Sequence, residues 1–184
     1  MEVIDINDIN KISKDDLKGK IIVFHTDTVY GVGALYQDEA GENKIYERKQ
    51  RSISKLLPVL CANIDQVKSL TVFNKKAEDI SKFWPGALTM ILNKIDGNGT
   101  LAVRIPDSEI ALKVLNQFGP LSTTSVNISN EKELNSVKEI IDRFSNWIDY
   151  IVVNEKEVSY TPSTIVDLTT DELKIIRNGS IKLT

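Results

Sequence analysis

The chain has 184 residues, and its 23 basic and 26 acidic side chains give a net charge of −3. Its composition, 41% hydrophobic and 27% charged, is typical of a globular protein, and the missing basic excess disfavours constitutive nucleic-acid binding. One cysteine (Cys61) and one histidine (His25) exclude an internal disulfide and a His/Cys zinc site. No apolar run approaches the ~18–20 residues of a membrane span, and residues 1–10 lack the basic region of a secretory signal. These features predict one cytoplasmic domain over residues 1–184 that makes no membrane contact.

Short apolar runs and amphipathic patterns alternate along the chain. The apolar runs are bounded by turn residues and predict strands at 21–24, 58–62, 88–92, 101–105, 150–153, 164–168 and 173–176. The amphipathic patterns predict helices at about 40–49, at 77–84 before Pro85-Gly86, at 110–118 before Gly119, and at 137–144 after the candidate cap Ser136. This interspersion predicts an α/β (α+β) fold with helices packed on a twisted sheet. The spacing is too irregular for a doubly wound fold.

Several common catalytic motifs are absent from the sequence. It contains no G-x-x-x-x-G-K-[ST] loop, no G-x-G-x-x-G after a strand and no G-x-S-x-G elbow. The chemistry is therefore expected to rely on positioning and electrostatics rather than on a covalent nucleophile.

Two candidate binding segments lie in the first third of the chain. The strand at 21–24 runs into a turn with the hydroxyls of Thr26 and Thr28, followed by glycines that permit close backbone approach. Lys49, Arg51 and Lys55 follow the first predicted helix and could converge on phosphate oxygens. An ordinary strand end and a solvated basic loop are the alternatives.

The remaining candidates lie on or beside later strands. Period-2 alternation places Thr100, Ala102 and Arg104 on one strand face, where the arginine could hold a carboxylate or make only a surface ion pair. Six of the nine residues in 121–129 carry a hydroxyl or amide, so this segment lines either a polar pocket or a surface edge. The last candidates are Ser163 and Arg177.

Taken together, these segments resemble the TsaC/YrdC family of threonylcarbamoyl-AMP synthases. The matching motifs follow the family order at 24–33, 49–51, 84–89, 101–104, 125–129, 163–167 and 176–179. The resemblance implies a YrdC-like fold, in which a twisted mixed β-sheet with flanking helices curves around a concave, positively lined cavity.

The resemblance also implies a nucleotidyltransferase reaction. L-Threonine, bicarbonate and ATP, with Mg²⁺ accompanying the ATP, would give threonylcarbamoyl-AMP and pyrophosphate. The product would serve the N6-threonylcarbamoyladenosine modification at tRNA position 37 through a separate threonylcarbamoyl-transfer complex, with at most a weak tRNA contact by this chain. Because a substrate carbamate would be the nucleophile, no covalent, acid–base or metal-ligating residue is expected.

The matching positions imply two sets of binding residues. Those implied for threonine are Thr26, Arg104, Thr123 and Ser163. Those implied for ATP are Lys49, Arg51, Lys55, Thr100, Ser125, Asn127 and Arg177, with Lys49 and Arg51 also contributing electrostatically.

The chain departs from the family pattern at several positions. His25 and Ser52 replace prolines, Leu60 replaces a substrate-contacting histidine, Val126 replaces an alanine, and residues 130–133 replace a loop rich in proline and serine. We interpret His25 as a local substitution rather than a catalytic base. The extra C-terminal domain of longer family members is also absent, so no lid from that domain is expected.

Two other functions are compatible with this fold. The first is an RNA-binding module without synthase activity. The second is carbamoyl transfer in hydrogenase maturation, which the lack of zinc-finger cysteines disfavours.

Overall fold

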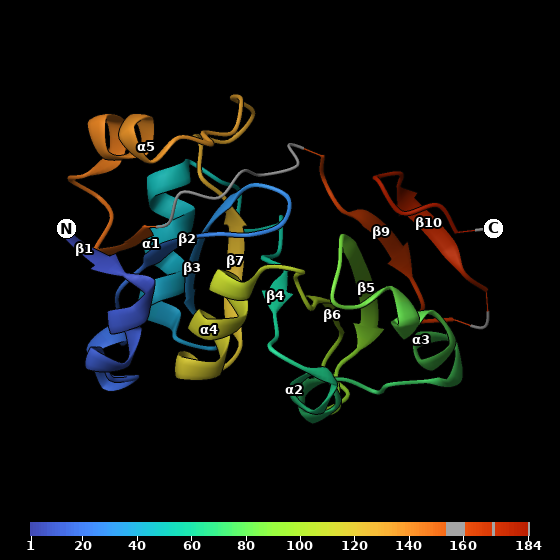
Figure 1. The fold of residues 1–184 in the computed structure, drawn as a ribbon. Helices are drawn as coiled ribbons and strands as arrows, with labels where there is room; N and C mark the ends of the chain where they lie inside the picture. Colours follow the sequence, from blue (N-terminus) through green and yellow to red (C-terminus); the bar gives the residue numbers. More distant parts are fainter. Residues whose placement is uncertain (154–160, 171, 184) are drawn as a thin grey trace.

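The fold is built around one mixed β-sheet, which the computed structural model describes for residues 1–153, 161–170 and 172–183. Its ten strands within these residues (Figure 1) are β1 (Glu2–Asp5), β2 (Ile22–His25), β3 (Tyr30–Leu35), β4 (Val59–Leu60), β5 (Leu88–Asn93), β6 (Thr100–Arg104), β7 (Leu121–Ser125), β8 (Tyr150–Val153), β9 (Thr164–Asp167) and β10 (Lys174–Arg177). Their order across the sheet is β1-β8-β2-β3-β7-β4-β6-β5-β9-β10. The pairs β1/β8, β2/β8, β4/β6 and β5/β9 are parallel, and the others are antiparallel.

The helices are short and begin at side-chain caps in most cases. The α-helices are α1 (Glu39–Lys49), α2 (Ile64–Leu70), α3 (Lys75–Ile80), α4 (Glu109–Phe118) and α5 (Val137–Phe144), and the 3₁₀ helices are η1 (Ile6–Lys11), η2 (Asp15–Leu17) and η3 (Ser81–Phe83). The caps Asn63, Asn74, Ser108 and Ser136 each accept a hydrogen bond from the backbone N–H three residues ahead. Among the described residues, no helix has the length and apolar character needed to cross a membrane.

The predicted α/β class and all seven predicted strands are confirmed, although the run at 58–62 contributes only the two residues of β4. The predicted helix at 77–84 is split between α3 and η3. Six elements were not predicted, namely the strands β1, β3 and β7, the helix α2 and the 3₁₀ helices η1 and η2. The segment 121–129 was expected at a surface edge or in a pocket, and its strand β7 pairs with neighbours on both sides in the middle of the sheet.

Both faces of the sheet are covered around β2 and β3. Ile22 and Phe24 of β2 pack with α4 and η1 on one face, while Ile21 and Val23 pack with α1 and α5 on the other. Alternate residues of one strand thus enter two different cores, as the period-2 geometry of a strand requires. Figure 1 shows α5 and α4 on opposite sides of these strands.

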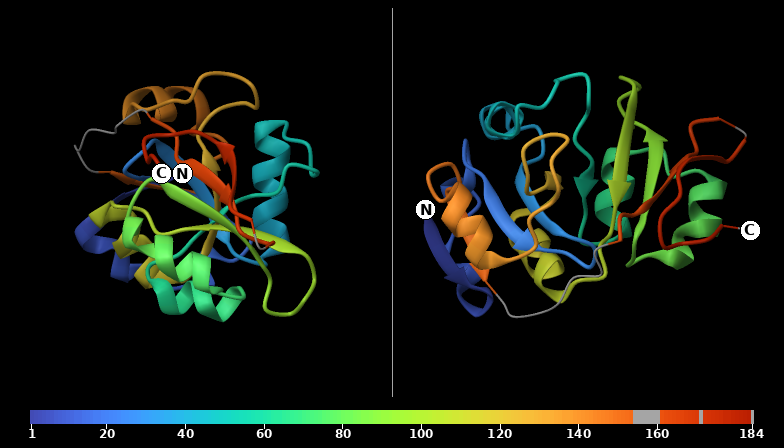
Figure 2. Two further views of the ribbon diagram at one scale, coloured as in Figure 1. Left: turned by 90° about the vertical axis from the view of Figure 1, so that its right-hand side faces the viewer. Right: turned by 90° about the horizontal axis from the view of Figure 1, so that it is seen from above.

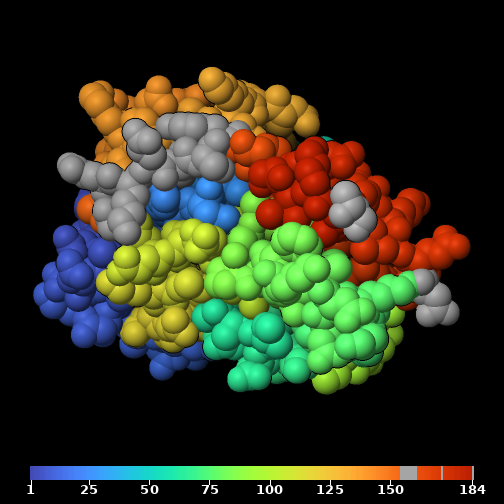
Figure 3. All heavy atoms as spheres, turned by 45° about the vertical axis from the view of Figure 1, so that its right-hand side comes forward, coloured from blue at the N-terminus to red at the C-terminus, as the bar shows by residue number. Residues whose placement is uncertain are grey.

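The other half of the sheet has a helical cover on one face. Leu88 and Met90 of β5 and Val103 of β6 belong to the core beneath α2 and α3, and Figure 3 shows these helices beside α4 on the outside of the molecule. The intervening residues Thr89 and Ala102 point to the opposite face and line a cavity. Seen from above in Figure 2, the sheet curves so that its two halves face each other.

Candidate active site

A cavity of about 600 Å³ lies on the inner, concave side of the curved sheet. This volume falls within the range of roughly 300–1,000 Å³ that is usual for small-molecule sites. Its walls come from the β2–β3 turn, from β3 to β7, from β9 and β10, and from the loops before β4 and after β7. Four basic residues and one acidic residue line it, namely Arg51, Arg104, Lys132, Arg177 and Glu133. The cavity therefore carries a net charge of about +3 (four minus one) in a chain of net charge −3, which favours anionic ligands.

The β2–β3 turn is organised by the hydroxyl of Thr26. This hydroxyl donates to the Val29 carbonyl at 2.6 Å and accepts from the backbone N–H groups of Thr28 and Val29, each at 3.2 Å. Thr26 lines the cavity, as predicted. Its hydroxyl is used within the turn, so the local role of Thr26 is to shape this wall.

The glycine at position 31 leaves room for the side chain of Thr123 on the neighbouring strand β7. A Cβ atom at Gly31 would come within 2.9 Å of the Thr123 Cγ2 methyl, a contact that real Cβ atoms do not tolerate. Gly31 pairs with Ser125 in the strand register. The glycine-containing segment is therefore a strand at the cavity wall, whereas the sequence had indicated only a permissive turn.

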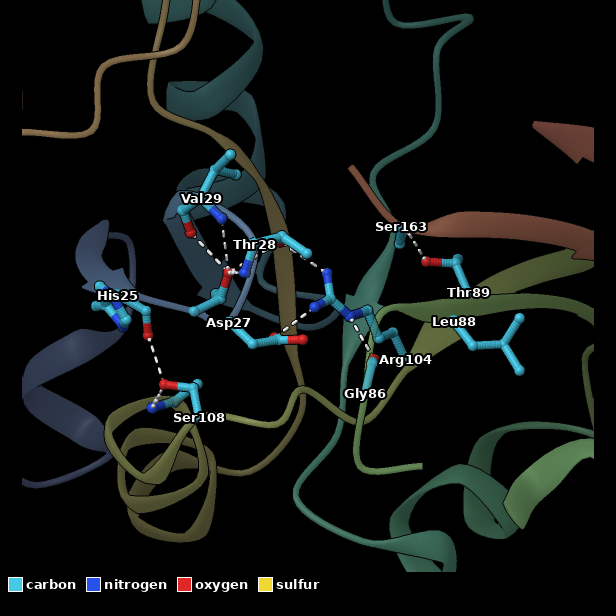
Figure 4. A network of polar contacts seen from close by, with 12 residues as sticks. His25, Asp27, Thr28, Val29, Gly86, Leu88, Thr89, Arg104, Ser108 and Ser163 are labelled. Atoms are coloured by element: carbon cyan, nitrogen blue, oxygen red, sulfur yellow. Dashed lines mark hydrogen bonds and ion pairs between the residues drawn. The ribbon is translucent and has the colours of Figure 1, made fainter. Parts of the chain in front are cut away.

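Arg104 is the most buried cationic group of the cavity wall. It ends β6 and is 6% exposed, and its side chain reaches across to the β2–β3 turn (Figure 4). Nε donates to the Gly86 carbonyl at 3.0 Å, Nη1 donates to Thr28 Oγ1 at 3.0 Å, and Nη2 forms an ion pair with Asp27. Burial lowers the pKa of Arg104, and the carboxylate of Asp27 opposes this shift. Thr100, Ala102 and Arg104 all line the cavity, so the predicted strand face is confirmed.

A second arginine holds the opposite wall. Arg177 donates through Nε and Nη2 to the Ser163 carbonyl at 3.0 and 2.9 Å, and through Nη2 to Ser163 Oγ at 3.1 Å. Ser163 Oγ is also 2.8 Å from Thr89 Oγ1, a pair visible in Figure 4. Burial lowers the pKa of Arg177, and the nearby charge of Arg104 lowers it further. Both arginines line the same cavity.

Lys49 lies behind the cavity wall rather than in it. The side chain is almost fully buried, and its ammonium donates to the Ser125 carbonyl at 2.5 Å, the Asn127 carbonyl at 2.7 Å and Asn127 Oδ1 at 2.8 Å. Ser125 Oγ donates to the same Asn127 Oδ1 at 2.7 Å. Burial, together with the charge of Arg51, lowers the pKa of Lys49 to about 8. Lys49 and Asn127 therefore support Ser125, which does line the cavity.

Arg51 organises the loop at the cavity entrance. Its Nε donates to the Lys55 carbonyl at 2.9 Å and its Nη2 to the Leu56 carbonyl at 3.1 Å. Arg51 and Leu56 line the cavity, whereas the exposed Lys55 does not. The basic loop is thus held by its own arginine.

The structure brings most of the predicted binding residues together, and their roles stay predictions. Those in the cavity wall are Thr26, Arg51, Thr100, Arg104, Thr123, Ser125, Ser163 and Arg177, and those outside it are Lys49, Lys55 and Asn127. Sequence reasoning named no role for five polar residues in or next to this wall: Asp27, Thr89, Lys132, Glu133 and Asn135. Asp27 and Thr89 lie within the matching motifs at 24–33 and 84–89. Lys132 and Glu133 belong to the segment 130–133, which had been interpreted only as a departure from the family pattern.

The single histidine and the single cysteine lie away from the cavity surface. His25 is 4% exposed, packs edge-on against the Tyr30 ring at 5.3 Å and points away from the cavity in Figure 4. Burial raises the pKa of Cys61 to about 12, so its thiol stays protonated at neutral pH. Neither residue lines the cavity, whereas Leu60 does.

A mixed α/β fold with a basic, hydroxyl-lined cavity on its concave side defines a protein that is suited to bind a small anionic ligand. Comparison with known proteins gives the family. The sequence model of the Sua5/YciO/YrdC family, described as "Telomere recombination", matches residues 17–179. The chain belongs to this family.

Two relatives and one solved structure show how far the similarity extends. A putative threonylcarbamoyl-AMP synthase of Methanocaldococcus jannaschii is 33% identical over 94% of this chain and 86% of its own length. The threonylcarbamoyl-AMP synthase of Pyrococcus abyssi is also 33% identical, over 90% of this chain and 52% of its own length. The crystal structure of P. abyssi Sua5 complexed with L-threonine has a TM-score of 0.88 and 30% identity, covering 97% of this chain and 58% of that one.

The comparison with these relatives bears on the length of the chain and on one alternative function. This chain spans about half the length of the P. abyssi enzyme. The relatives are enzymes by name, so they do not favour the alternative of an RNA-binding module without synthase activity.

Proposed function

We propose that this chain is an L-threonylcarbamoyladenylate synthase that condenses L-threonine, bicarbonate and ATP. The observation that carries this proposal is the 600 Å³ cavity in which three arginines and a lysine face hydroxyl-bearing strands, in a chain that matches the family over residues 17–179. The relatives of the same length class and the longer P. abyssi protein carry this activity in their names.

The chemistry fits a cavity without a protein nucleophile. The threonine amine and bicarbonate form a carbamate with loss of water. A carbamate oxygen then attacks the α-phosphorus of ATP, and pyrophosphate leaves. Both reactants are anionic, so the protein's main contribution is to hold them together and offset their repulsion. Arg51, Arg104 and Arg177 supply that positive charge from three sides of the cavity.

The two substrates occupy different walls in this proposal. L-Threonine lies toward Arg104, Thr123 and Ser163, with Thr26 shaping the turn beside them. Five N–H groups are available on a guanidinium, and three of Arg104 are used in hydrogen bonds within the described residues. The remaining N–H on each Nη is free for a substrate carboxylate.

ATP lies toward Arg51, Thr100, Ser125 and Arg177. Lys49 and Asn127 act on this wall from behind, through their hydrogen bonds to each other and to Ser125. Lys55 supplies a carbonyl to Arg51 and an exposed positive charge near the entrance.

Mg²⁺ accompanies ATP in this proposal rather than binding a protein site. Within the described residues, no group of three His, Cys, Asp or Glu side chains is placed to hold a metal ion. A magnesium ion usually keeps several waters and binds through substrate phosphates. The ion would therefore enter with the triphosphate and neutralise part of its charge.

The product would supply the threonylcarbamoyl group for the N6-threonylcarbamoyladenosine modification of tRNA in the cytoplasm. A separate transfer complex would carry out that later step. The overall acidic charge of the chain supports at most a weak tRNA contact.

Pyrophosphate release tests the proposal. Purified protein with ATP, Mg²⁺, bicarbonate and L-threonine should release pyrophosphate in a threonine-dependent reaction, and threonylcarbamoyl-AMP should be detected by mass spectrometry. Omission of bicarbonate should abolish the product. Pyrophosphate release that does not depend on threonine would contradict the assignment.

A further inference from the structure

The guanidinium of Arg104 is held by three acceptors from two separate segments. The Gly86 carbonyl binds Nε, and the β2–β3 turn supplies Thr28 Oγ1 to Nη1 and the Asp27 carboxylate to Nη2. Gly86 is itself anchored, because its N–H donates to the Ile105 carbonyl at 2.9 Å. Arg104 is thus bonded across the molecule, from the end of β6 to the turn after β2, as Figure 4 shows.

The Asp27 carboxylate is the only charged partner in this set. Its side chain is 16% exposed and that of Arg104 is 8% exposed. A charge buried this deeply needs a counter-charge, and the nearby positive charge of Arg177 increases that need. Asp27 meets it from the side of the turn.

Asp27 itself stays out of the cavity. Its neighbours Thr26, Thr28 and Val29 line the cavity, as does Arg104, but Asp27 does not. A carboxylate that bound the substrate's amino group would have to face the cavity. This placement separates Asp27 from the ligand, so Asp27 can act on the ligand only through Arg104.

We infer that Asp27 is a positioning residue, which fixes the Arg104 guanidinium so that its two remaining N–H groups face the carboxylate of the bound amino acid. An arginine side chain loses considerable rotamer freedom when it is immobilised. In this protein the loss occurs on folding, before the substrate arrives. Thr28 assists by binding Nη1 from the same turn.

A competing arrangement would give the opposite result. If the Asp27 carboxylate merely occupied the place of the substrate carboxylate, it would have to leave before the substrate could bind. Removing its charge would then strengthen binding of the amino acid. In the positioning arrangement, removing the charge weakens binding because the guanidinium is no longer held.

The test uses Asp27→Asn, which keeps the shape of the side chain and removes its charge. Calorimetry should show L-threonine binding weakened by about ten-fold, which corresponds to about 1.4 kcal/mol, while ATP binding changes by less than about two-fold. Asp142→Asn is the matched control, because Asp142 pairs with Lys138 on the exposed face of α5. This control should leave both affinities unchanged. Unchanged or tighter threonine binding by Asp27→Asn would overturn the inference.

A crystal structure of the Asp27→Asn variant decides the inference without reference to substrate. In Asp27→Asn the Arg104 guanidinium should leave the Gly86 carbonyl or Thr28 Oγ1, whereas in Asp27→Glu, which keeps the charge, it should stay on both. Asp27→Ala is the uncharged variant to use if Asp27→Asn does not fold. An unmoved guanidinium would overturn the inference. The link to threonine rests on the proposed function, but the proposed function and the role of Asp27 can fail separately. A wild-type protein that bound no threonine would contradict the proposed function. The position of Arg104 in the variants would still decide the role of Asp27.

Discussion

Arg104 and Arg51 both line the cavity, but the protein holds them in different ways. Arg104 is 6% exposed, and its partners lie on two segments far from it in sequence. Arg51 is half-buried, and its side chain donates to carbonyls four and five residues ahead in its own loop. The wall at Arg104 is therefore part of the folded core, whereas the wall at Arg51 can adjust with its loop. A rigid wall suits a small amino acid, and an adjustable one suits a longer nucleotide.

The largest effect is expected from Arg104→Ala. Its loss leaves the Asp27 carboxylate without its buried partner, so the free energy of unfolding should fall by about 3–5 kcal/mol. The kcat/KM for threonine should fall by at least about a hundred-fold because the carboxylate of the substrate threonine loses its charged partner. Urea unfolding and initial-rate kinetics measure both. An Arg104→Ala variant with unchanged stability and normal threonine kinetics would contradict a rigid, threonine-binding wall at Arg104.

The close packing of β3 on β7 should produce the next largest effect. Gly31→Ala places a methyl group 2.9 Å from Thr123 Cγ2, and such overpacking is expected to lower the free energy of unfolding by about 1–3 kcal/mol. Thr123→Ser removes that methyl, so the double variant should be more stable than the sum of the two single effects implies. Urea unfolding measures these free energies. If the effects of Gly31→Ala and Thr123→Ser were additive, the two side chains would not be in close contact.

Residues of this rigid wall were also the hardest to predict from sequence. The strand β3 was missed because Gly31 and Gly33 favour a turn when read alone, although in the structure Gly31 makes room for the Thr123 side chain on β7. The strand β7 was missed because its Ser and Thr residues are unfavourable in a buried strand. In the fold, Ser122 Oγ donates to Glu42, which is 80 residues away in the sequence, and Thr123 Oγ1 donates to the Leu121 carbonyl two residues away.

The apolar strands and the face of β6 could be predicted because alternation is a local property. The partnership of Asp27 with Arg104 could not, since 77 residues separate them. Similarly, the family resemblance placed Lys49 among the ATP-binding residues, yet only the fold reveals that its ammonium is directed at three oxygen atoms behind Ser125. Long-range hydrogen bonds of this kind leave no periodic pattern in the sequence.

A pH series tests the support behind the wall at Ser125. The pKa of Lys49 is lowered to about 8 from its ordinary value of 10.5, so between these pH values the unfolded chain binds more protons than the folded one. Stability from this group therefore rises with pH across that window. Between pH 7 and about 9.5, wild type should gain roughly 1–2 kcal/mol relative to Lys49→Met. The exposed Lys55→Met should show no such difference from wild type, and parallel pH curves for Lys49→Met and wild type would contradict burial of a charged ammonium.

The smallest effect on stability is expected at Arg51, and this prediction sharpens the contrast with Arg104. Arg51→Ala breaks hydrogen bonds within a largely exposed loop, so the free energy of unfolding should change by less than about 1 kcal/mol. The KM for ATP should nevertheless rise by about ten-fold, since one charge-assisted contact to phosphate is lost, while the KM for threonine stays within about two-fold. Arg48→Ala, an exposed arginine of α1 outside the cavity wall, is the matched control. If Arg51→Ala raised the KM for threonine and the KM for ATP equally, the walls at Arg104 and Arg51 would not act independently. The loop at Arg51 would then belong to the same rigid site as Arg104.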